Sequence, residues 1–468
     1  MSSLVRVDYR SDTVTRPTQE MLSAMVNAPV GDDVYQDDPT VHQLEKKCAD
    51  LCGMEAGLFV CSGVMSNQIA LRCHLKPMEE VICDHRAHVY RSEQGGIMFH
   101  SNASVMPIIP HEGSTHITAQ QIEAKINTKV DYHTPISSVI SLENTIMGTV
   151  VPVEEIAATH TLARKHGLKM HLDGARIWNA STATGIELKQ YGQYFDSISL
   201  CLSKGLGAPI GSVLVGSKDF IALARRYRKL FGGGWRQAGL LAGAAIYAID
   251  NIWPLLKKDH ENAQKLSKGL IEMGFKITVP VETNFVFVNG EDINFSFRHA
   301  HPFLLAHGVL ITPNGFNCRM AVHHQVTSEG VDLTLSLIKQ LITSRFIYRV
   351  MSNEDYKKSV VDDHYPGTAQ EIKEGFLHFS TKETIRQSAE IYQKGVKDLV
   401  LLKIDPLKLT DLDALRWVTV STRQSKAFPH LHGKLPLSAV VSEKHIPFDE
   451  KTQAHDWSES EVIEQVEQ

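Results

Sequence analysis

The order of apolar segments constrains the fold of this chain more than any other feature. From Met1 to about Ile342, short β-rich runs alternate with longer segments of helical pattern. The β-rich runs include VISLEN from Val139 and LKMHLDGA from Leu168, and the helical segment EEIAATHTLARKHG lies between them. Because parallel strands need a long crossover connection, this alternation predicts an α/β fold with a mostly parallel sheet that helices cover on both faces.

Two later changes in the pattern predict further structural units. Near Thr283 the strand-like TNFVFVNG is followed by PFLLAHG, a helical run, and GVLITPNG, a strand and turn. After LTLSLIKQLI the chain changes character again, and cysteine does not occur beyond Cys318. We therefore predict a large domain over about 1–250, a small α+β lobe over about 251–343, a separate α+β module over 344–450 and an acidic tail over 451–468.

Composition narrows the class of partner. The 468 residues include 48 Lys+Arg and 53 Asp+Glu, so a net charge of −5 gives no field that attracts nucleic acid or an anionic membrane. Seven cysteines without a CxxC pair indicate a reducing compartment rather than a disulfide framework. The longest apolar run, around AGLLAGAAIYAI from Ala238, is shorter than the ~20 residues of a membrane span. We expect a cytoplasmic protein that acts on a small molecule, with no nucleic-acid or membrane partner.

Two polar residues at strand ends indicate a chemistry. Asp173 lies in HLDGAR and Lys204 lies in LSKG, each directly after a β-rich run. Catalysis with pyridoxal phosphate needs a lysine that holds the cofactor covalently and a carboxylate beside the pyridine nitrogen. Ends of neighbouring strands in an α/β sheet suit that pair. On the residues alone, a plain surface ion pair remains an equal alternative.

A strand, a turn and a helix follow one another in FVCSGVMSNQ from Phe59. Free N–H groups at the start of such a helix, around Ser62, Gly63 and Val64, can bind a phosphate. Taken alone, the same pattern is more often a simple helix cap.

Taken together, the motifs resemble one enzyme family. They are RSDTVTRPT, VGDDVYQDDPTVHQLE, SGVMSNQ, CDHRAHVYRSEQGG, ISLENT, HLDGARIWNA, FDSISLCLSKGLGAPIGSVLVG and FGGGWRQAG. In this order, from about Val7 to Ile342, they are similar to the low-specificity L-threonine aldolases, and most similar to the fungal members. These are fold-type I pyridoxal-phosphate enzymes, so the resemblance implies that fold and the cofactor pyridoxal 5'-phosphate.

The resemblance also implies roles for individual residues. Lys204 would bind the cofactor, Asp173 would pair with its pyridine nitrogen and His88 would stack on its ring, which makes these three the catalytic residues. Ser62, Gly63 and Val64 would hold the phosphate. The remaining candidates are Arg176 near both cofactor and substrate, Arg236 on the cofactor phosphate, and Ser11 and Arg319 with Arg176 on the substrate carboxylate.

In the family, the arginine matched by Arg236 reaches the phosphate of the neighbouring subunit. Tyr35 and the acidic run GDDVYQDD match an interface loop, so a homodimer or homotetramer is implied. No metal ligand is expected.

The implied reaction is retro-aldol cleavage of L-threonine or L-allo-threonine to glycine and acetaldehyde. Two alternatives remain open: an alanine-type amino-acid racemase with the same cofactor, and a scaffold or binding fusion that works through the C-terminal module.

Three positions depart from common family patterns. Val64 replaces a threonine of the phosphate turn, Ser92 replaces an aromatic residue of many bacterial members, and Ile146 stands where those members have a histidine. These changes predict a more apolar substrate pocket that accepts bulkier side chains.

The segment from Phe346 to about Phe448 resembles a small family of uncharacterised, mostly bacterial domains, with a fold similar to the ADP-ribosyltransferase group. Its polar residues are candidates for lining a pocket: His378, Ser380, Thr381, His430 and His432.

Overall fold

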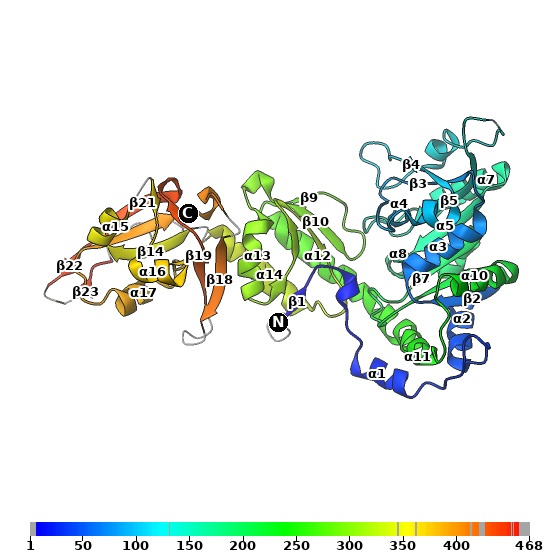
Figure 1. Ribbon diagram of the computed structural model, residues 1–468, viewed down its shortest axis with the longest axis horizontal. Helices are drawn as coiled ribbons and strands as arrows, with labels where there is room; N and C mark the ends of the chain where they lie inside the picture. The colour runs from blue at the N-terminus through cyan, green and yellow to red at the C-terminus, as the bar shows by residue number, and fades with distance from the viewer. Residues whose placement is uncertain are drawn as a thin grey trace.

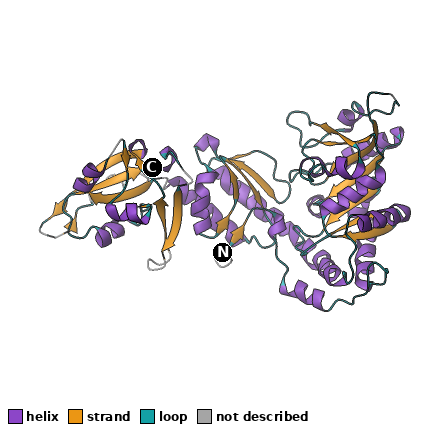
Figure 2. Ribbon diagram, in the orientation of Figure 1, coloured by secondary structure: helices purple, strands orange, loops and turns teal. Residues whose placement is uncertain are grey.

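The computed structural model describes residues 6–130, 132–343, 346–360, 363–411, 414–420, 426–450, 452 and 454–457. Figure 1 shows three lobes along the long axis. The blue and cyan segments and part of the green ones build the lobe on the right, further green segments build the middle one, and yellow to red segments build the one on the left. Strands form the centre of each lobe, with helices around them (Figure 2).

The right-hand lobe is built on a seven-stranded sheet of order β2-β8-β7-β6-β5-β3-β4. Only β8 runs antiparallel to its neighbours, and the other pairings are parallel. The mostly parallel α/β sheet predicted from the sequence is therefore confirmed. The strands are β2 (Ala56–Val60), β3 (Glu79–Asp84), β4 (Ser104–Ile108), β5 (Ile136–Glu143), β6 (Lys169–Gly174), β7 (Ser197–Cys201) and β8 (Ser212–Gly216).

Helices cover both faces of this sheet. Because successive side chains of a strand point to opposite faces, Leu58 and Val60 pack toward one helical layer and Phe59 toward the other. The first layer contains α3 (Gly63–His74), α4 (His88–Arg91), α5 (Gly96–Ser101) and α10 (Lys218–Leu230). The second contains α1 (Gln19–Val26), α2 (Pro39–Cys52), α6 (Ala119–Glu123), α7 (Val153–His166), α8 (Ile177–Thr184), α9 (Leu188–Gly192) and α11 (Gly239–Tyr247).

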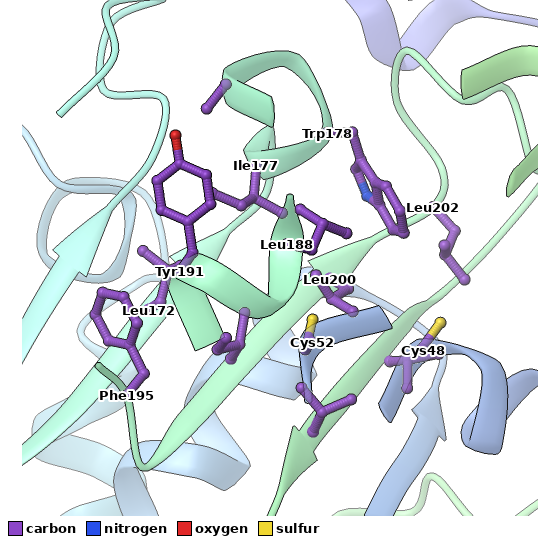
Figure 3. Packing of buried hydrophobic residues seen from close by; sticks show 14 of the residues in the cluster. Cys48, Cys52, Leu172, Ile177, Trp178, Leu188, Tyr191, Phe195, Leu200 and Leu202 are labelled. Carbon is purple, nitrogen blue, oxygen red and sulfur yellow. The ribbon is translucent and has the colours of Figure 1, made fainter. Parts of the chain in front are cut away.

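Figure 3 shows part of the second layer. Leu172 of β6 and Leu200 of β7 meet Trp178 of α8 and Tyr191 of α9, all nearly fully buried. Burying one such aliphatic side chain contributes roughly 1.5–3 kcal/mol. This packing fixes the strands whose ends carry the candidate site. All seven cysteines are free.

The middle lobe contains a four-stranded antiparallel sheet of order β12-β13-β10-β9. The N-terminal strand β1 (Val7–Asp8) pairs with β11 (Val309–Leu310), so the start of the chain belongs to this lobe (Figure 1). The other elements are β9 (Lys276–Ile277), β10 (Phe285–Asn289), β12 (Thr312–Asn314), β13 (Asn317–Ala321), α12 (Leu256–Glu272), α13 (Phe297–Ala306) and α14 (Ser328–Thr343).

The left-hand lobe is α+β and has its own core, around Tyr365, Leu402 and Leu435. It contacts the middle lobe through Trp417, whose ring lies edge-on 4.7 Å from that of Phe303. Its two main sheets have the orders β14-β17-β21 and β16-β19-β18. They comprise β14 (Ile347–Ser352), β16 (Leu377–His378), β17 (Leu399–Ile404), β18 (Leu415–Val420), β19 (Lys426–Leu431) and β21 (Val440–Ile446); around them lie α15 (Asn353–Ser359), α16 (Ala369–Glu374), α17 (Ile385–Tyr392), β15 (His364–Tyr365), β20 (Leu435–Pro436), β22 (Phe448–Asp449) and β23 (Ala454–His455). Most of the predicted acidic tail lies outside the described residues.

One helical stretch, Gly239–Glu272, is long and apolar enough to cross a membrane by length and composition alone. It joins α11 to α12 through a π-helical turn and a short 3-10 turn that contains Pro254. Ala242, Ala245 and Ile249 pack in the main core. Core helices of globular proteins pass the same test, so this stretch gives no reason to place the chain in a bilayer.

Candidate active site

The carboxyl ends of three neighbouring parallel strands meet at one edge of the central sheet. Glu143 at the end of β5 is the strand partner of Asp173 in β6, and Lys204 follows the end of β7 at Cys201. This edge is where open α/β sheets bind ligands. The structure thus brings the predicted pair, Asp173 and Lys204, to one place.

Asp173 is 3% exposed and is held from two sides. Its Oδ2 accepts a hydrogen bond from the Nδ2 of Asn67 at 2.8 Å, and its Oδ1 accepts one from the backbone N–H of Ala175 at 3.0 Å. A buried carboxylate needs such donors to stay charged. Its position is therefore fixed before any ligand binds.

His88 begins helix α4 and is positioned by a fully buried glutamate. Its Nδ1 lies 2.8 Å from Oε1 of Glu93, and its backbone N–H donates to Oε2 of Glu143 at 2.7 Å. The hydrogen bond to Glu93 raises the pKa of His88 above its usual value. Glu93 also accepts from Asn67 at 2.9 Å and from Gln68 at 2.5 Å, so the ring orientation is locked by helix α3.

Asn67 extends this network through the core. Its Oδ1 lies 3.1 Å from Nε2 of His171, whose Nδ1 lies 2.9 Å from the hydroxyl of Ser197. That hydroxyl also lies 2.8 Å from Nε2 of His74. Burial lowers the pKa of His171 to about 4 and that of His74 to about 3. Both rings are neutral at pH 7, and they orient Asn67 without adding charge.

Glu143 is a second carboxyl beside Asp173. Burial, together with the charge of Asp173, raises the pKa of Glu143 to about 7. A group with that pKa can hold a proton and release it near neutral pH. The site therefore places a carboxyl group with a pKa near neutrality directly beside Asp173.

Lys204 lies in a loop tied to other parts of the chain. Its carbonyl oxygen accepts hydrogen bonds from the hydroxyl of Thr15 at 2.9 Å and from the backbone N–H of Gly207 at 2.8 Å. Its charge acts on Asp12, His88 and Glu143. Lys204 is thus close enough to all three side chains to influence them electrostatically.

The first turn of α3 contains the predicted phosphate residues. Ser62 is the N-cap, and its hydroxyl accepts from the N–H of Met65 at 3.1 Å. The first N–H groups of a helix, here those of Gly63 and Val64, have no intrahelical partner. The buried hydroxyl of Ser212, without a partner in the described part of the chain, lies 3.5 Å from the place of a Cβ on Gly63. Donors thus gather where an anion would bind.

Arg176 forms a bidentate ion pair with a residue that the sequence analysis did not select. Its Nε and Nη2 donate to the two carboxylate oxygens of Asp12, each at 2.7 Å. Burial alone would raise the pKa of Asp12, but Arg176 lowers it to about 2. This pairing occupies one edge of the guanidinium and leaves Nη1 without a partner among the described residues.

Arg319 lies beside Arg176 over the same aromatic ring. The two guanidinium carbons are 5.2 Å and 4.4 Å from the centre of Phe285. Nη2 of Arg319 donates to the carbonyl of Arg10 at 2.7 Å, next to Ser11, whose hydroxyl caps the short helix that starts at Asp12. The three predicted carboxylate ligands, Ser11, Arg176 and Arg319, therefore come together.

Arg236 and Tyr35 lie apart from the carboxyl cluster. Arg236 is exposed and its Nη1 donates to Asp32 at 3.0 Å. Tyr35 is 77% exposed on the same acidic loop. Within one chain, the structure does not bring Arg236 into hydrogen bonding with the other predicted cofactor residues.

The three departures from the family pattern differ in environment. Val64 is 40% exposed at the start of α3 and Ser92 is exposed after α4. Ile146 is 3% exposed and belongs to the main core. The prediction of a more apolar substrate pocket stays a prediction.

Four site residues escaped the sequence analysis: Asp12, Asn67, Glu93 and Glu143. Each lies inside a motif in which the sequence pointed to a different residue. The motifs are, in the same order, RSDTVTRPT, SGVMSNQ, RSEQGG and ISLENT. Only Glu143, the last residue of strand β5, carried a local signal, because a polar residue at a strand end is a site candidate; Asn67 lies inside helix α3, Glu93 follows α4 and Asp12 lies in a short 3-10 helix.

One group among the described residues could hold a metal ion: His88, Glu93 and Asp173 place their ligand atoms within 4.8 Å of one another. Their hydrogen bonds with each other and with Asn67 already account for this closeness. The cluster belongs to the site described above.

Comparisons with known proteins identify the family of the chain. The family of beta-eliminating lyases matches residues 8–292. The low-specificity L-threonine aldolase of Saccharomyces cerevisiae is 42% identical over 344 residues, 73% of this chain and 87% of the relative. That of Escherichia coli K12 is 42% identical over 323 residues, 69% of this chain and 95% of the relative. A family of unknown function (DUF952) matches residues 350–443.

The solved structure of a Leishmania major threonine aldolase has the same fold, with a TM-score of 0.63 and 20% identity over 72% of this chain and 99% of that one. Fold and site together define the class: a fold-type I pyridoxal-phosphate-dependent lyase. The chain belongs to the beta-eliminating lyase family and, within it, to the low-specificity L-threonine aldolases. These relatives favour neither the racemase nor the scaffold alternative.

Proposed function

We propose that this chain binds pyridoxal 5'-phosphate and cleaves L-threonine and L-allo-threonine to glycine and acetaldehyde. One observation carries the proposal: the buried Asp173, the ring of His88 and the lysine Lys204 lie together at the carboxyl edge of the sheet. The relatives that match 69–73% of the chain carry this activity in their names.

The residues present fit the cofactor. The buried carboxyl group of Asp173 would pair with a pyridine nitrogen, and the start of α3 with Ser62, Gly63 and Val64 offers donors for a phosphate. The unpartnered hydroxyl of Ser212 beside Gly63 is a further donor. When bound, this cofactor accepts the electron pair of the Cα–Cβ bond that breaks.

The chain's own side chains bind and orient the substrate. Arg176 and Arg319 lie beside Ser11, and each keeps guanidinium N–H groups without a partner in the described part of the chain. A planar guanidinium can hold a carboxylate bidentately. Asp12 keeps Arg176 in place. Fixing the carboxylate would fix the rotation of the substrate about its Cα atom, so that the same bond is presented for cleavage each time.

His88 and Asp173 act on proton positions. Asp173, held by Asn67, would keep a proton on the pyridine nitrogen of the bound cofactor. His88 would provide a flat surface for the cofactor ring, and Glu93 holds the imidazole of His88 in its orientation. These roles make Lys204, His88 and Asp173 the proposed catalytic residues, with no metal ion involved.

We further propose that the active form is a homodimer or homotetramer. Tyr35, Val26 and Val30 expose apolar surface on and near the acidic loop. Arg236 is exposed beside that loop, so it can reach a phosphate across an interface. Free cysteines and the homologous enzymes suit a cytoplasmic protein of glycine synthesis and threonine breakdown, working without nucleic acid or membrane.

The division into units 1–343, 344–450 and 451–468 is kept as a proposal. Helix α14 ends at Thr343 and strand β14 begins at Ile347. The match to the first family ends at residue 292, and the match to the second begins at residue 350.

The test is an assay of purified protein loaded with the cofactor. Acetaldehyde release from each epimer of threonine is followed beside the Lys204→Ala variant and a control, Lys218→Ala, at an exposed lysine. We expect a yellow protein that releases acetaldehyde, a colourless and inactive Lys204→Ala variant and a fully active control. A yellow protein that releases none and racemises alanine would overturn the proposal.

A further inference from the structure

The C-terminal module contains a cavity that is separate from the carboxyl cluster. Its volume is about 720 Å³, within the roughly 300–1,000 Å³ of small-molecule sites. It lies at the edge strand β14 and is walled by α16, β16, α17 and β19. Of the five residues selected from the sequence, His378, Ser380 and His430 line it, whereas Thr381 and His432 do not.

A buried ion pair forms one wall of this cavity. Both terminal nitrogens of Arg349 donate to Glu371 at 2.7 Å, and they also donate to the carbonyl of His378 and to the hydroxyl of Tyr365. The two side chains are 6% and 7% exposed. Such a pair adds little net stability because its desolvation costs about as much as its attraction returns. The main effect of this ion pair is therefore to fix the shape of the cavity.

The charges on the wall disfavour an anionic ligand. Arg349 is neutralised by Glu371 and has no free edge to offer. Glu374 adds a further carboxylate, 3.7 Å from Nε2 of His378. A phosphate or carboxylate would therefore meet net negative charge.

His430 supplies the polar group that lacks a partner. It is 8% exposed, and its ring stacks on Phe376 at 4.5 Å and meets His378 edge-on at 4.9 Å. Burial, helped by His378 and His432, lowers the pKa of His430 to about 4. A neutral imidazole carries one donor and one acceptor. Neither has a hydrogen-bond partner in the part of the chain that the structure describes.

Tyr392 supplies an aromatic surface at this cavity. It lines the cavity and is 71% exposed, whereas Phe379 and Phe428, which also line it, are only 3% and 6% exposed. Aromatic faces favour flat ligands that stack on them. The combination of a neutral donor and acceptor with apolar faces suits a ring that carries both hydrogen-bonding functions.

We propose that this cavity binds a flat, uncharged nitrogen heterocycle of nucleoside size, hydrogen-bonded to His430, and discriminates against the phosphorylated form of the same molecule. The site is independent of the proposed aldolase reaction.

The test is calorimetric titration of the full-length, cofactor-loaded protein with adenosine, inosine, cytidine and uridine, and with their 5'-monophosphates. We expect at least one nucleoside to bind, and at least about 10-fold more tightly than its monophosphate, which corresponds to ~1.4 kcal/mol. His430→Phe keeps the stacking on Phe376 and should weaken binding at least about 10-fold.

The matched control is His432→Phe, because His432 also contacts Phe376, at 5.2 Å, but does not line the cavity. This variant should bind as the parent does. Tyr392→Ala changes an exposed position and should also weaken binding. It tests the proposal if His430→Phe does not fold. The proposal is overturned if no nucleoside binds below about 1 mM, if the monophosphates bind as well or better, or if folded His430→Phe and Tyr392→Ala both bind normally.

Discussion

The side-chain amide of Asn67 lies 2.8 Å from Oδ2 of Asp173, and the same nitrogen donates to Glu93 at 2.9 Å. One amide therefore joins the carboxylate of the proposed cofactor site to the glutamate that orients His88. All three side chains are buried, where hydrogen bonds to charged groups contribute roughly 1.5–3 kcal/mol each. The relative position of His88 and Asp173 is thus set by helix α3, which also provides the phosphate turn.

Replacing Glu93 by glutamine tests this network. Glu93→Gln keeps the shape and removes the charge that raises the pKa of His88. We expect kcat to fall about 10-fold or more, as one charge-assisted hydrogen bond implies. Because the pKa of His88 then returns toward its ordinary value, the limb of the pH–rate profile that reports His88 should move to lower pH. Steady-state kinetics across pH measure both effects.

The matched control is Glu80→Gln, another buried glutamate, which accepts a hydrogen bond from Ser137 at 2.7 Å outside the site. The pH–rate profile of Glu80→Gln should have the same shape as that of the parent protein. If Glu93→Gln lowered stability but left the pH profile unchanged, Glu93 would be a structural residue only.

The pairing of Arg176 with Asp12 predicts that lysine cannot replace this arginine. Lysine keeps the positive charge but loses the planar fork that binds two oxygens. For Arg176→Lys we expect KM for threonine to rise about 10-fold or more. Arg10→Lys alters a similar bidentate pair with Asp8 at an exposed position and should change KM little. Equal KM values for the two variants would rule out the proposed substrate clamp.

The buried carboxyl group of Asp259, in helix α12, should make the free energy of unfolding depend on pH. It is 1% exposed, neither carboxyl oxygen has a partner among the described residues, and burial with the charge of Asp12 raises its pKa to about 8. The native state therefore binds a proton that the unfolded state releases above its ordinary pKa near 4. Stability should fall as the pH rises from about 4 to about 8, by up to ~1.4 kcal/mol per pH unit.

Asp259→Asn removes this dependence. Denaturant unfolding of the cofactor-free protein should show the variant equal to the parent near pH 4 and more stable by ~2 kcal/mol or more at pH 8. Glu272→Gln, at an exposed position of the same helix, should show no such trend. A parallel pH dependence in parent and Asp259→Asn would contradict the assignment.

The central sheet and the positions of Asp173 and Lys204 at strand ends could be predicted because their signals are local. The runs around Val139 and Leu168 are apolar and short, and the second carries Asp173 next to its end; Glu143, at the end of the first, was not selected. Lys204 and Asp173 were found because the chemistry requires one lysine and one carboxylate at neighbouring strand ends.

The positioning residues could not be predicted in the same way. Asn67 lies one turn into a helix whose start was read as a phosphate turn, and nothing local shows that its amide reaches β6. Asp12 meets Arg176 across 164 positions of sequence because β1 joins the middle lobe. Contacts between residues so far apart in the sequence depend on how the lobes pack together. The periodicity of apolar residues gives no information on that packing.

The buried pair Arg349–Glu371 yields the last prediction. Removing one partner leaves an unpaired buried charge, which costs about 3–5 kcal/mol, whereas replacing both by apolar residues is often neutral. Arg349→Met and Glu371→Leu should therefore each unfold the C-terminal module at lower denaturant, and the double variant should recover most of the loss. Lys397→Met, in an exposed pair with Glu450, should cost less than about 1 kcal/mol. Acetaldehyde release in the same samples shows whether the other two lobes remain folded. If the double variant were as unstable as the sum of the two single variants, the two side chains would act independently, and the pair would not fix the wall of the cavity.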